Sequence, residues 1–258
     1  MVIMMIGDVV GRRSVEFLAS HLWNIRKLHG IDLVVANGEN ASIGNGLLPA
    51  DAQDLFAAGV DVITSGNHIW NRRQLYEMLD DSECLLRPHN YPPQNPGRGY
   101  CHVRTPKGTV MVINLQGTVY MESLENPFET AQRLLEEKRG DANVVLVDFH
   151  AEATSEKRAL AEYLDGRITA LVGTHTHVAT ADERVLSGGT AFLTDLGMTG
   201  PRDSVLGVDK KAVIKKFLDR TPVRFEQADG PIQMDAAIIT ADEKTGLASA
   251  IERFHILK

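Results

Sequence analysis

The feature that most constrains the fold is a repeated alternation of short apolar runs with stretches whose apolar residues recur every three or four positions. Residues 2–6 are all apolar, and residues 14–29 then show the helical spacing, followed by Gly30. A short, wholly apolar run is typical of a strand that is buried on both faces. The periodic stretch is typical of an amphipathic helix, and a glycine is a common helix terminator.

The same alternation continues along the chain. It predicts strands at 31–36, 60–64, 109–115, 143–149 and 168–172, and helices at 49–58, 72–79, 127–138 and 155–164. Strands that alternate with helices indicate an α/β fold, with a largely parallel sheet between layers of helices. The proline-rich residues 88–99 predict a surface loop, and residues 223–227, 234–240 and 248–254 predict added antiparallel strands. Without repeats or low-complexity segments, we expect one domain over residues 1–258.

Composition and charge exclude several function classes. The chain has 258 residues, of which 43% are hydrophobic and 24% charged, and its net charge is −7. It has no block rich in Lys or Arg, which argues against an extended nucleic-acid surface. No apolar run approaches the roughly 20 residues that a membrane span needs. Cys84 and Cys101 lack metal-site spacing, so we expect two reduced thiols and a cytoplasmic protein with no membrane partner.

Residues with metal-binding side chains follow five of the predicted strands. They are Asp8, Glu39 with Asn40, Asn67 with His68, His150, and His175 with His177. In an open α/β sheet the carboxyl ends of the strands line the binding crevice. We therefore expect these side chains to meet at one edge of the sheet.

Each of these residues has an ordinary alternative role when it is considered alone. Asp8 could cap the segment that follows it, and Asn40 and Asn67 could be turn residues. The pair His175 and His177 is a stronger signal, because side chains two positions apart on an extended segment point to the same side. Considered together, the set favours a functional site over unrelated structural roles.

The donor types indicate which ions and which chemistry the site suits. Carboxylate, amide and imidazole groups without a thiolate bind Mn, Fe, Co or Zn. The set is too large for one tetrahedral ion, so two metal ions are the better fit. Two ions that share a carboxylate and a bridging hydroxide can hold a phosphoryl group between them. The pattern therefore predicts a phosphoesterase that acts on a small anionic substrate by attack of the metal-bridging hydroxide.

The motifs resemble, in order and spacing, those of the calcineurin-like metallophosphoesterases, and more closely the YmdB-like branch of bacterial phosphodiesterases. They read Gly7-Asp8, Asn37-Gly38-Glu39-Asn40, Gly66-Asn67-His68, Asp148-Phe149-His150-Ala151-Glu152, Gly173-Thr174-His175-Thr176-His177 and Met198-Thr199-Gly200-Pro201. The resemblance covers almost the whole chain. It implies a layered β-sheet core flanked by helices, that is, an αββα sandwich, and a homo-oligomer is a further expectation.

The resemblance also implies a role for each residue. One metal ion would be held by Asp8, Asn40 and His177, and the other by Asn67, His150 and His175. Glu39 would bridge the two ions, and His68 would be the general acid that protonates the leaving alkoxide. The implied metal is iron, and the implied substrates are small phosphodiesters that include 2′,3′-cyclic nucleotides.

The sequence departs from the wider superfamily at two positions. Val10 stands where a histidine is usual, and Glu39 stands where an aspartate usually bridges. We expect Asn40 to fill the place of the missing histidine. His68 has a second interpretation, because it could hydrogen-bond a phosphate oxygen without transferring a proton.

Two other functions remain as alternatives to a phosphodiesterase. The first is a phosphomonoesterase or nucleotidase, since the residues themselves do not distinguish diesters from monoesters. The second is a regulatory module that binds nucleotides or RNA ends without turnover. A complete set of metal-binding residues together with His68 favours catalysis over binding alone.

Overall fold

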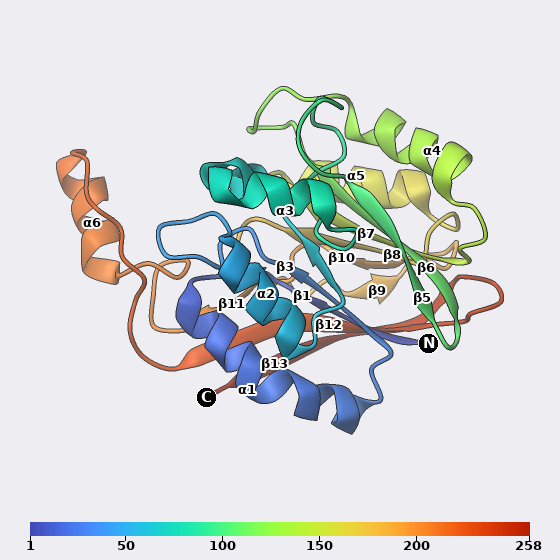
Figure 1. Ribbon diagram of the computed structural model, residues 1–258, viewed down its shortest axis with the longest axis horizontal. Helices are drawn as coiled ribbons and strands as arrows, with labels where there is room; N and C mark the ends of the chain where they lie inside the picture. Colours follow the sequence, from blue (N-terminus) through green and yellow to red (C-terminus); the bar gives the residue numbers. More distant parts are fainter.

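Two β-sheets pack face to face, with helices on both outer faces, in the computed structural model, which describes residues 1–258 (Figure 1). The seven-stranded sheet has the order β2-β11-β12-β1-β3-β4, with β13 paired to β12, and the six-stranded sheet has the order β5-β6-β7-β8-β10-β9. This arrangement confirms the predicted α/β fold with a layered core. None of the helices is long and apolar enough to cross a membrane.

The seven-stranded sheet combines parallel and antiparallel pairs. Its strands are β1 (Val2–Ile6), β2 (Asp8–Val9), β3 (Leu33–Asn37), β4 (Val62–Thr64), β11 (Met198–Pro201), β12 (Ile232–Ala241) and β13 (Ala248–Leu257). Strands β1, β3 and β4 run parallel, whereas β12 is antiparallel to β1, β11 and β13. Two helices, α1 (Arg12–His29) and α2 (Pro49–Ala58), cover its outer face.

The six-stranded sheet contains the second parallel set. Its strands are β5 (Tyr100–Thr105), β6 (Gly108–Gln116), β7 (Val144–His150), β8 (Ala170–Thr174), β9 (Arg184–Val185) and β10 (Ala191–Leu193). Strands β6, β7, β8 and β10 run parallel. Two helices, α4 (Pro127–Lys138) and α5 (Thr154–Leu164), cover its outer face.

The wholly apolar strands contact an apolar core on both faces of their sheet. Ile3 and Met5 of β1 point into the core between the two sheets, whereas Met4 and Ile6 pack with residues of α1. Leu146 of β7 lies in the same central core, opposite the first sheet. Because every second residue meets a different apolar layer, these strands show no polar alternation in the sequence.

Three sequence predictions were wrong. The carboxyl ends of the predicted strands do not lie at the edge of a single sheet. Strands β1, β3 and β4 belong to one sheet, and β7 and β8 belong to the other. Residues 223–227 form no strand but an irregular segment with a single bridge at Gln227. The helix predicted at 72–79 is divided into a 3₁₀ turn (Arg73–Leu75) and a short α3 (Tyr76–Asp81), and another 3₁₀ turn (Asn67–Asn71) precedes it.

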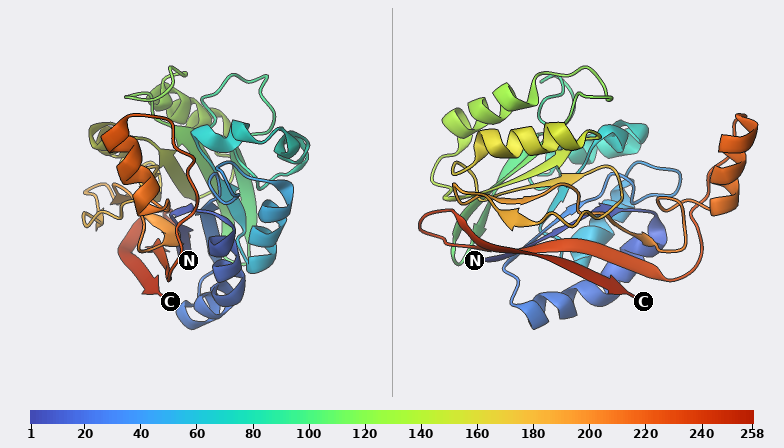
Figure 2. Two further views of the ribbon diagram at one scale, coloured as in Figure 1. Left: turned by 90° about the vertical axis from the view of Figure 1, so that its left-hand side faces the viewer. Right: turned by 180° about the vertical axis from the view of Figure 1, so that it is seen from behind.

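The elements that had not been predicted are the strands β2, β5, β9, β10 and β11 and the helix α6. Strand β5 has one buried residue and lies at a sheet edge, so its sequence is mixed in polarity. Helix α6 (Lys210–Asp219) has a single buried residue and lies away from both sheets (Figures 1 and 2). The antiparallel pair β12 and β13 confirms the prediction for the C-terminal part. The single domain over residues 1–258 stays a prediction, which the shared core between the sheets supports.

Candidate functional site

The eight side chains singled out in the sequence lie together at the carboxyl ends of strands from both sheets. Asp8, Glu39 with Asn40, and Asn67 with His68 follow β1, β3 and β4, while His150 ends β7, and His175 and His177 follow β8. Parallel strands direct their carboxyl ends the same way, and the packed sheets bring the two sets of ends together. The grouping was therefore predicted correctly, although two sheets build it and not one.

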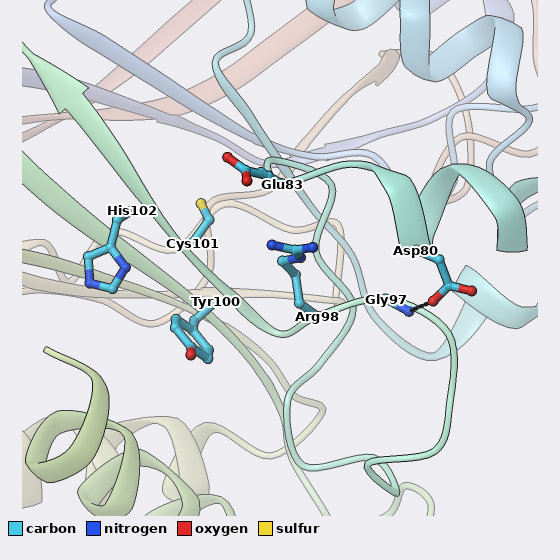
Figure 3. A pocket seen from close by; sticks show the side chains of 7 residues that line it. All are labelled: Asp80, Glu83, Gly97, Arg98, Tyr100, Cys101 and His102. Carbon is cyan, nitrogen blue, oxygen red and sulfur yellow. Dashed lines mark hydrogen bonds between the residues drawn. The ribbon is translucent and has the colours of Figure 1, made fainter.

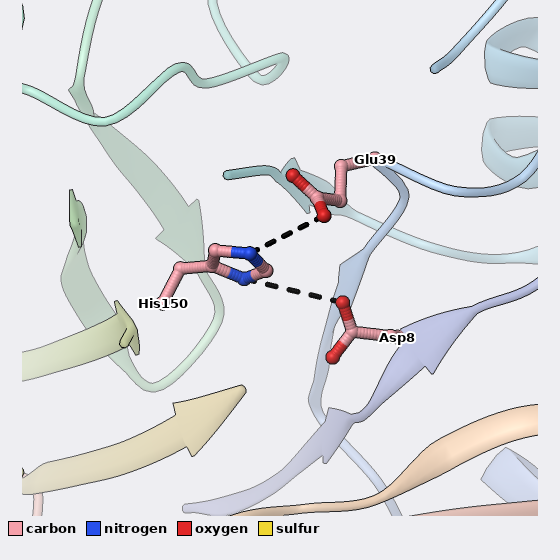
Figure 4. Close-up of side chains that lie close together, drawn as sticks. All are labelled: Asp8, Glu39 and His150. Atoms are coloured by element: carbon pink, nitrogen blue, oxygen red, sulfur yellow. Dashed lines mark ion pairs between the residues drawn. The ribbon is translucent and has the colours of Figure 1, made fainter. Parts of the chain in front are cut away.

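The centre of the group is a buried trio of Asp8, Glu39 and His150 (Figure 4). Their exposed fractions are 0%, 1% and 0%. His150 Nε2 lies 3.2 Å from Glu39 Oε1, and His150 Nδ1 lies 3.9 Å from Asp8 Oδ1. One donor atom from each of the three lies within 4.8 Å of the others, so a single cation could contact all three.

Asp8 provides the sharpest test of whether the group suits a metal ion. Its Oδ1 is buried and has no hydrogen-bond partner, while its Oδ2 accepts the backbone N–H of His175 at 3.0 Å. A buried carboxylate oxygen without a partner is costly, and a divalent cation would satisfy it. The neighbouring donors are carboxylate, imidazole and amide groups, which suit Mn, Fe, Co or Zn. The residues present fit the metal ions that the resemblance implied.

The remaining donors form one group on each side of Glu39. On one side, His150 Nε2 lies 3.2 Å from Asn67 Oδ1 and 3.1 Å from His175 Nδ1. On the other side, His177 Nε2 lies 3.7 Å from Asp8 Oδ1 and 3.3 Å from Asn40 Nδ2. These two groups correspond to the division of ligands that the resemblance implied. The ligand roles themselves stay a prediction.

Asn40 presents its amide in one particular orientation. Its Nδ2 faces Glu39 Oε1 at 3.0 Å and His177, and its Oδ1 lies 2.8 Å from His68 Nδ1. An amide nitrogen cannot ligate a metal ion, because only the oxygen has a lone pair available. For Asn40 to act as a ligand, its amide must turn so that Oδ1 faces His177, and the contact with His68 is then lost or reversed.

The histidines after β8 reach the cluster through left-handed backbone and not through an extended segment, so that part of the sequence interpretation was wrong. The φ angles are 104° at His175 and 63° at His177. Such conformations cost a non-glycine residue about 1–3 kcal/mol and persist only where the surroundings hold them. The turn directs His175 toward His150 and His177 toward Asp8 and Asn40.

Burial and ion pairing shift the pKa values of the central residues in opposite directions. Burial raises the pKa of Asp8. Burial also acts to raise the pKa of Glu39, but the His150 and His68 imidazoles outweigh it and hold that pKa well below its usual value. Burial lowers the pKa of His175 to about 3, with a further contribution from His150. His175 is therefore neutral at physiological pH, which is the form that binds a metal ion.

His68 lies at the edge of the cluster with one ring nitrogen engaged. Its Nδ1 lies 3.1 Å from Glu39 Oε1, and its backbone N–H donates to Glu39 Oε2 at 2.9 Å. The hydrogen bond to Glu39 raises the pKa of His68, although burial partly opposes this. The side chain is 32% exposed, and Nε2 has no hydrogen bond to the protein. Nε2 is therefore the atom available to a ligand.

A polar network behind the cluster was mostly missed in the sequence. Thr174 Oγ1 lies 3.0 Å from His150 Nδ1 and donates to Asp148 Oδ1 at 2.7 Å. Asn37 Nδ2 donates to Asp148 Oδ2 at 3.0 Å. Such partners fix the ring orientation of a histidine. Asn37, Asp148 and Thr174 all belong to the quoted motifs, but nothing in the sequence shows that the three side chains meet behind His150.

Two further acidic residues contact the histidine segment. Glu152 Oε2 lies 3.1 Å from His175 Nε2. Asp195 is fully buried, accepts the backbone N–H of Thr176 at 3.1 Å, and pairs with the buried Lys157 at 2.7 Å. Lys157 of α5 thus holds, through Asp195, the backbone that lies between His175 and His177.

The glycines beside the cluster are needed for close packing of the chain itself. A Cβ at Gly66 would lie 2.1 Å from Cδ2 of His150, and one at Gly173 would lie 1.9 Å from the carbonyl oxygen of Thr194. In the structure, the space beside them is occupied by neighbouring protein atoms.

A cavity of about 570 Å³ lies apart from the cluster (Figure 3). It is lined by Asp80, Glu83, Gly97, Arg98, Tyr100, Cys101 and His102. None of these residues belongs to the predicted set. The two cysteines are free thiols, as expected, and the hydrogen bond with Cys101 lowers the pKa of Cys84 to about 7.

Comparison with known proteins identifies relatives over the whole length. The family model described as YmdB-like protein matches residues 4–254. A 2′,3′-cyclic-nucleotide 2′-phosphodiesterase of Bacillus subtilis is 42% identical over 98% of this chain and 96% of its own. A solved protein of Thermus thermophilus described as hypothetical has a TM-score of 0.94 at 40% identity and full coverage of both chains. A solved phosphatase of Mycoplasma pneumoniae has a TM-score of 0.94 at 32% identity, covering 100% of this chain and 93% of its own.

Lys157→Met is expected to lower the free energy of unfolding by about 3–5 kcal/mol, because it leaves the buried Asp195 carboxylate without its cation. Urea denaturation measures the loss. Lys138→Met at the exposed end of α4 is the matched control and should change stability by less than about 0.5 kcal/mol. Equal stability of the two variants would contradict a supporting role for the Lys157–Asp195 pair.

Proposed function

Because the chain belongs to the YmdB-like family and is a metallophosphoesterase, we propose that it hydrolyses small phosphodiesters, with 2′,3′-cyclic nucleotides as the substrate class, with the help of two divalent metal ions. The observation that carries the two-metal proposal is the pair of donor groups on either side of the buried Glu39. The phosphodiester preference rests on the named activity of the Bacillus subtilis relative.

The proposed ligand assignment follows the observed grouping. Asp8, Asn40 and His177 would hold one ion, Asn67, His150 and His175 would hold the other, and Glu39 would contact both. We propose iron as the native metal, with Mn, Zn or Co as the alternatives. When bound, divalent ions lower the pKa of coordinated water and offset negative charge on a phosphoryl group. The amide and imidazole ligands are neutral, so the bound centre keeps a positive charge that attracts an anionic substrate.

His68 is proposed as the proton donor to the leaving oxygen. Its Nδ1 is held by Glu39, which leaves Nε2 available to a ligand. The carboxylate of Glu39 raises the pKa of His68, and this keeps the ring protonated to higher pH than a free histidine. A protonated imidazole at the mouth of the site can donate to an alkoxide as the phosphorus–oxygen bond breaks.

Of the two alternative functions, one is excluded and the other is kept. A binding module without turnover is set aside, because the chain is a metallophosphoesterase. A preference for monoesters is a competing specificity for the same site.

We expect a preference for diesters over monoesters. The value of kcat/KM for bis(p-nitrophenyl) phosphate should exceed that for p-nitrophenyl phosphate by at least about tenfold, and 2′,3′-cyclic nucleotides should be opened to monoesters. Both aryl substrates release the same chromophore, so one assay compares them directly. Faster turnover of the monoester would replace the proposal with a phosphomonoesterase.

Asn40→Ala is expected to reduce the metal content of the purified protein from about two ions per chain to about one, because it removes a ligand from the group that contains His177. Elemental analysis of protein purified without added metal gives both the number of ions and the native metal. Asn95→Ala, in the proline-rich loop, serves as the control and should keep two ions. Full occupancy of both sites in Asn40→Ala would remove Asn40 from the ligand set.

His68→Ala should distinguish proton transfer from simple binding. For a cyclic nucleotide, whose leaving group is a strongly basic alkoxide, kcat should fall by about 10²–10⁴. For bis(p-nitrophenyl) phosphate, whose leaving group needs no proton, kcat should fall by less than about tenfold. The metal content should stay unchanged. Equal losses on both substrates would mean that His68 binds the phosphate and does not act as an acid.

A further inference from the structure

A second, smaller cavity lies directly beside the candidate site. Its volume is about 220 Å³, and Asn40 lines it. The same Asn40 side chain belongs to the cluster, where its Nδ2 lies 3.3 Å from Nε2 of His177. The cavity is therefore next to the donor group that contains Asp8 and His177. A molecule whose phosphate is bound at the cluster can extend its remaining atoms into this cavity.

The walls of the cavity come from four stretches of chain, which are residues 10–11, 40–45, 207–208 and 225–227. The backbone N–H of Gly11 donates to the carbonyl oxygen of Asn40 at 2.8 Å. Nε2 of Gln227 donates to the carbonyl oxygen of Val10 at 2.6 Å. A Cβ at Gly207 would lie 2.5 Å from Cγ1 of Val10, so the chain is closely packed there. The walls are therefore part of the packed body, although α6 extends away from it (Figures 1 and 2).

The lining of the cavity is apolar and aromatic over much of its area. Phe225 is 40% exposed and Ile43 is 72% exposed, and the two come from different walls. Nζ of Lys216 lies over the Phe225 ring, 4.7 Å from its centre, and this contact helps to hold the ring in place. The only charged side chain in the lining is the carboxylate of Glu226. A second phosphate group would be repelled by it, so the cavity suits an uncharged and partly apolar group.

A nucleobase has the chemistry that this lining requires. Its flat faces stack on aromatic and apolar side chains, and every base has such a face. Its edge carries hydrogen-bond donors and acceptors, which the side-chain amides of Asn45 and Gln227 can complement. A cyclic nucleotide carries its base and its phosphate on one ribose. The base can therefore occupy the cavity while the phosphate is bound at the adjacent cluster.

We propose, on the basis of the proposed function, that this cavity is the nucleobase subsite and that Phe225 determines specificity by stacking on the base. Ile43 contacts the base from the opposite wall. The subsite gives the enzyme a preference for nucleotides over phosphodiesters that lack a base. Because stacking does not depend on the identity of the base, discrimination among the four bases is weak.

The first test is ligand binding to the metal-loaded, full-length protein, measured by isothermal titration calorimetry. The probes are adenosine 3′-monophosphate and inorganic phosphate. Phe225→Ala should raise the dissociation constant of the nucleotide at least about tenfold and change that of inorganic phosphate less than about twofold. Phe225→Tyr keeps an aromatic ring and should bind the nucleotide as the unaltered protein does. Phe217→Ala, at a 75% exposed position of α6 outside the cavity, is the matched control and should change neither constant.

The second test compares two cyclic phosphodiesters that differ in the presence of a base. They are adenosine 2′,3′-cyclic monophosphate and the cyclic phosphate of ethylene glycol. In Phe225→Ala, the ratio of their kcat/KM values should fall at least about tenfold, because only the nucleotide loses a contact. An unchanged ratio, or equal nucleotide binding by Phe225→Ala and the unaltered protein, would overturn the subsite.

Failure of the subsite and failure of the proposed function give different results. If the nucleotide binds through Phe225 but its cyclic form is not hydrolysed, the subsite stands and the proposed function is wrong. If Phe225→Tyr binds the nucleotide as weakly as Phe225→Ala, the ring does not act by stacking and the subsite proposal is wrong. Unchanged metal content and circular dichroism confirm that each variant is folded.

Discussion

Burial of two carboxylates at the junction of the two sheets is the constraint on which the rest of the site depends. Asp8 and Glu39 are removed from water almost completely, and burying ionised groups is costly unless they are paired. The imidazole of His150 supplies one partner to both. The distance to Asp8 Oδ1 is too long for a hydrogen bond, and this oxygen has no other donor, so the cluster has a surplus of acceptors that cations can satisfy. The strongest physical argument for metal binding is therefore this deficit of positive charge.

The surrounding structure holds the donors by two separate means. On the side of β7, Asn37, Thr174 and Asp148 form a closed set of hydrogen bonds that fixes the ring of His150. After β8, the backbone takes conformations that are unfavourable for histidine, and Asp195 and Lys157 hold it there. The energy of folding is thus used to keep the donors close together. A preorganised set of this kind binds ions and orients a substrate without further rearrangement.

Helix α6 contrasts with this tightly packed centre. Around the cluster, a single added methyl group at Gly66 would collide with His150, whereas α6 exposes three large apolar side chains. The two regions meet where Leu206 contacts His177. The candidate site is therefore in direct contact with the start of the segment that leads to α6.

Much of the fold and the membership of the site followed from the sequence alone. Apolar runs and helical periodicity depend on local burial, so they predicted most strands and helices, and the motifs after strands identified all eight side chains that the structure brings together. The irregular segment at 223–227, the helix α6 and the strand β5 could not be predicted, because their residues are exposed or of mixed polarity.

What only the tertiary structure decided was how distant parts of the chain combine. The division of parallel strands between two sheets, the left-handed backbone at His175 and His177, and the network of Asn37 and Thr174 depend on contacts between residues far apart in the sequence. The sequence by itself determined which side chains stand at the ends of strands, since that depends on local patterning. Their distances, burial and pairing were decided by the packing of one sheet on the other, because no local pattern records which faces will meet.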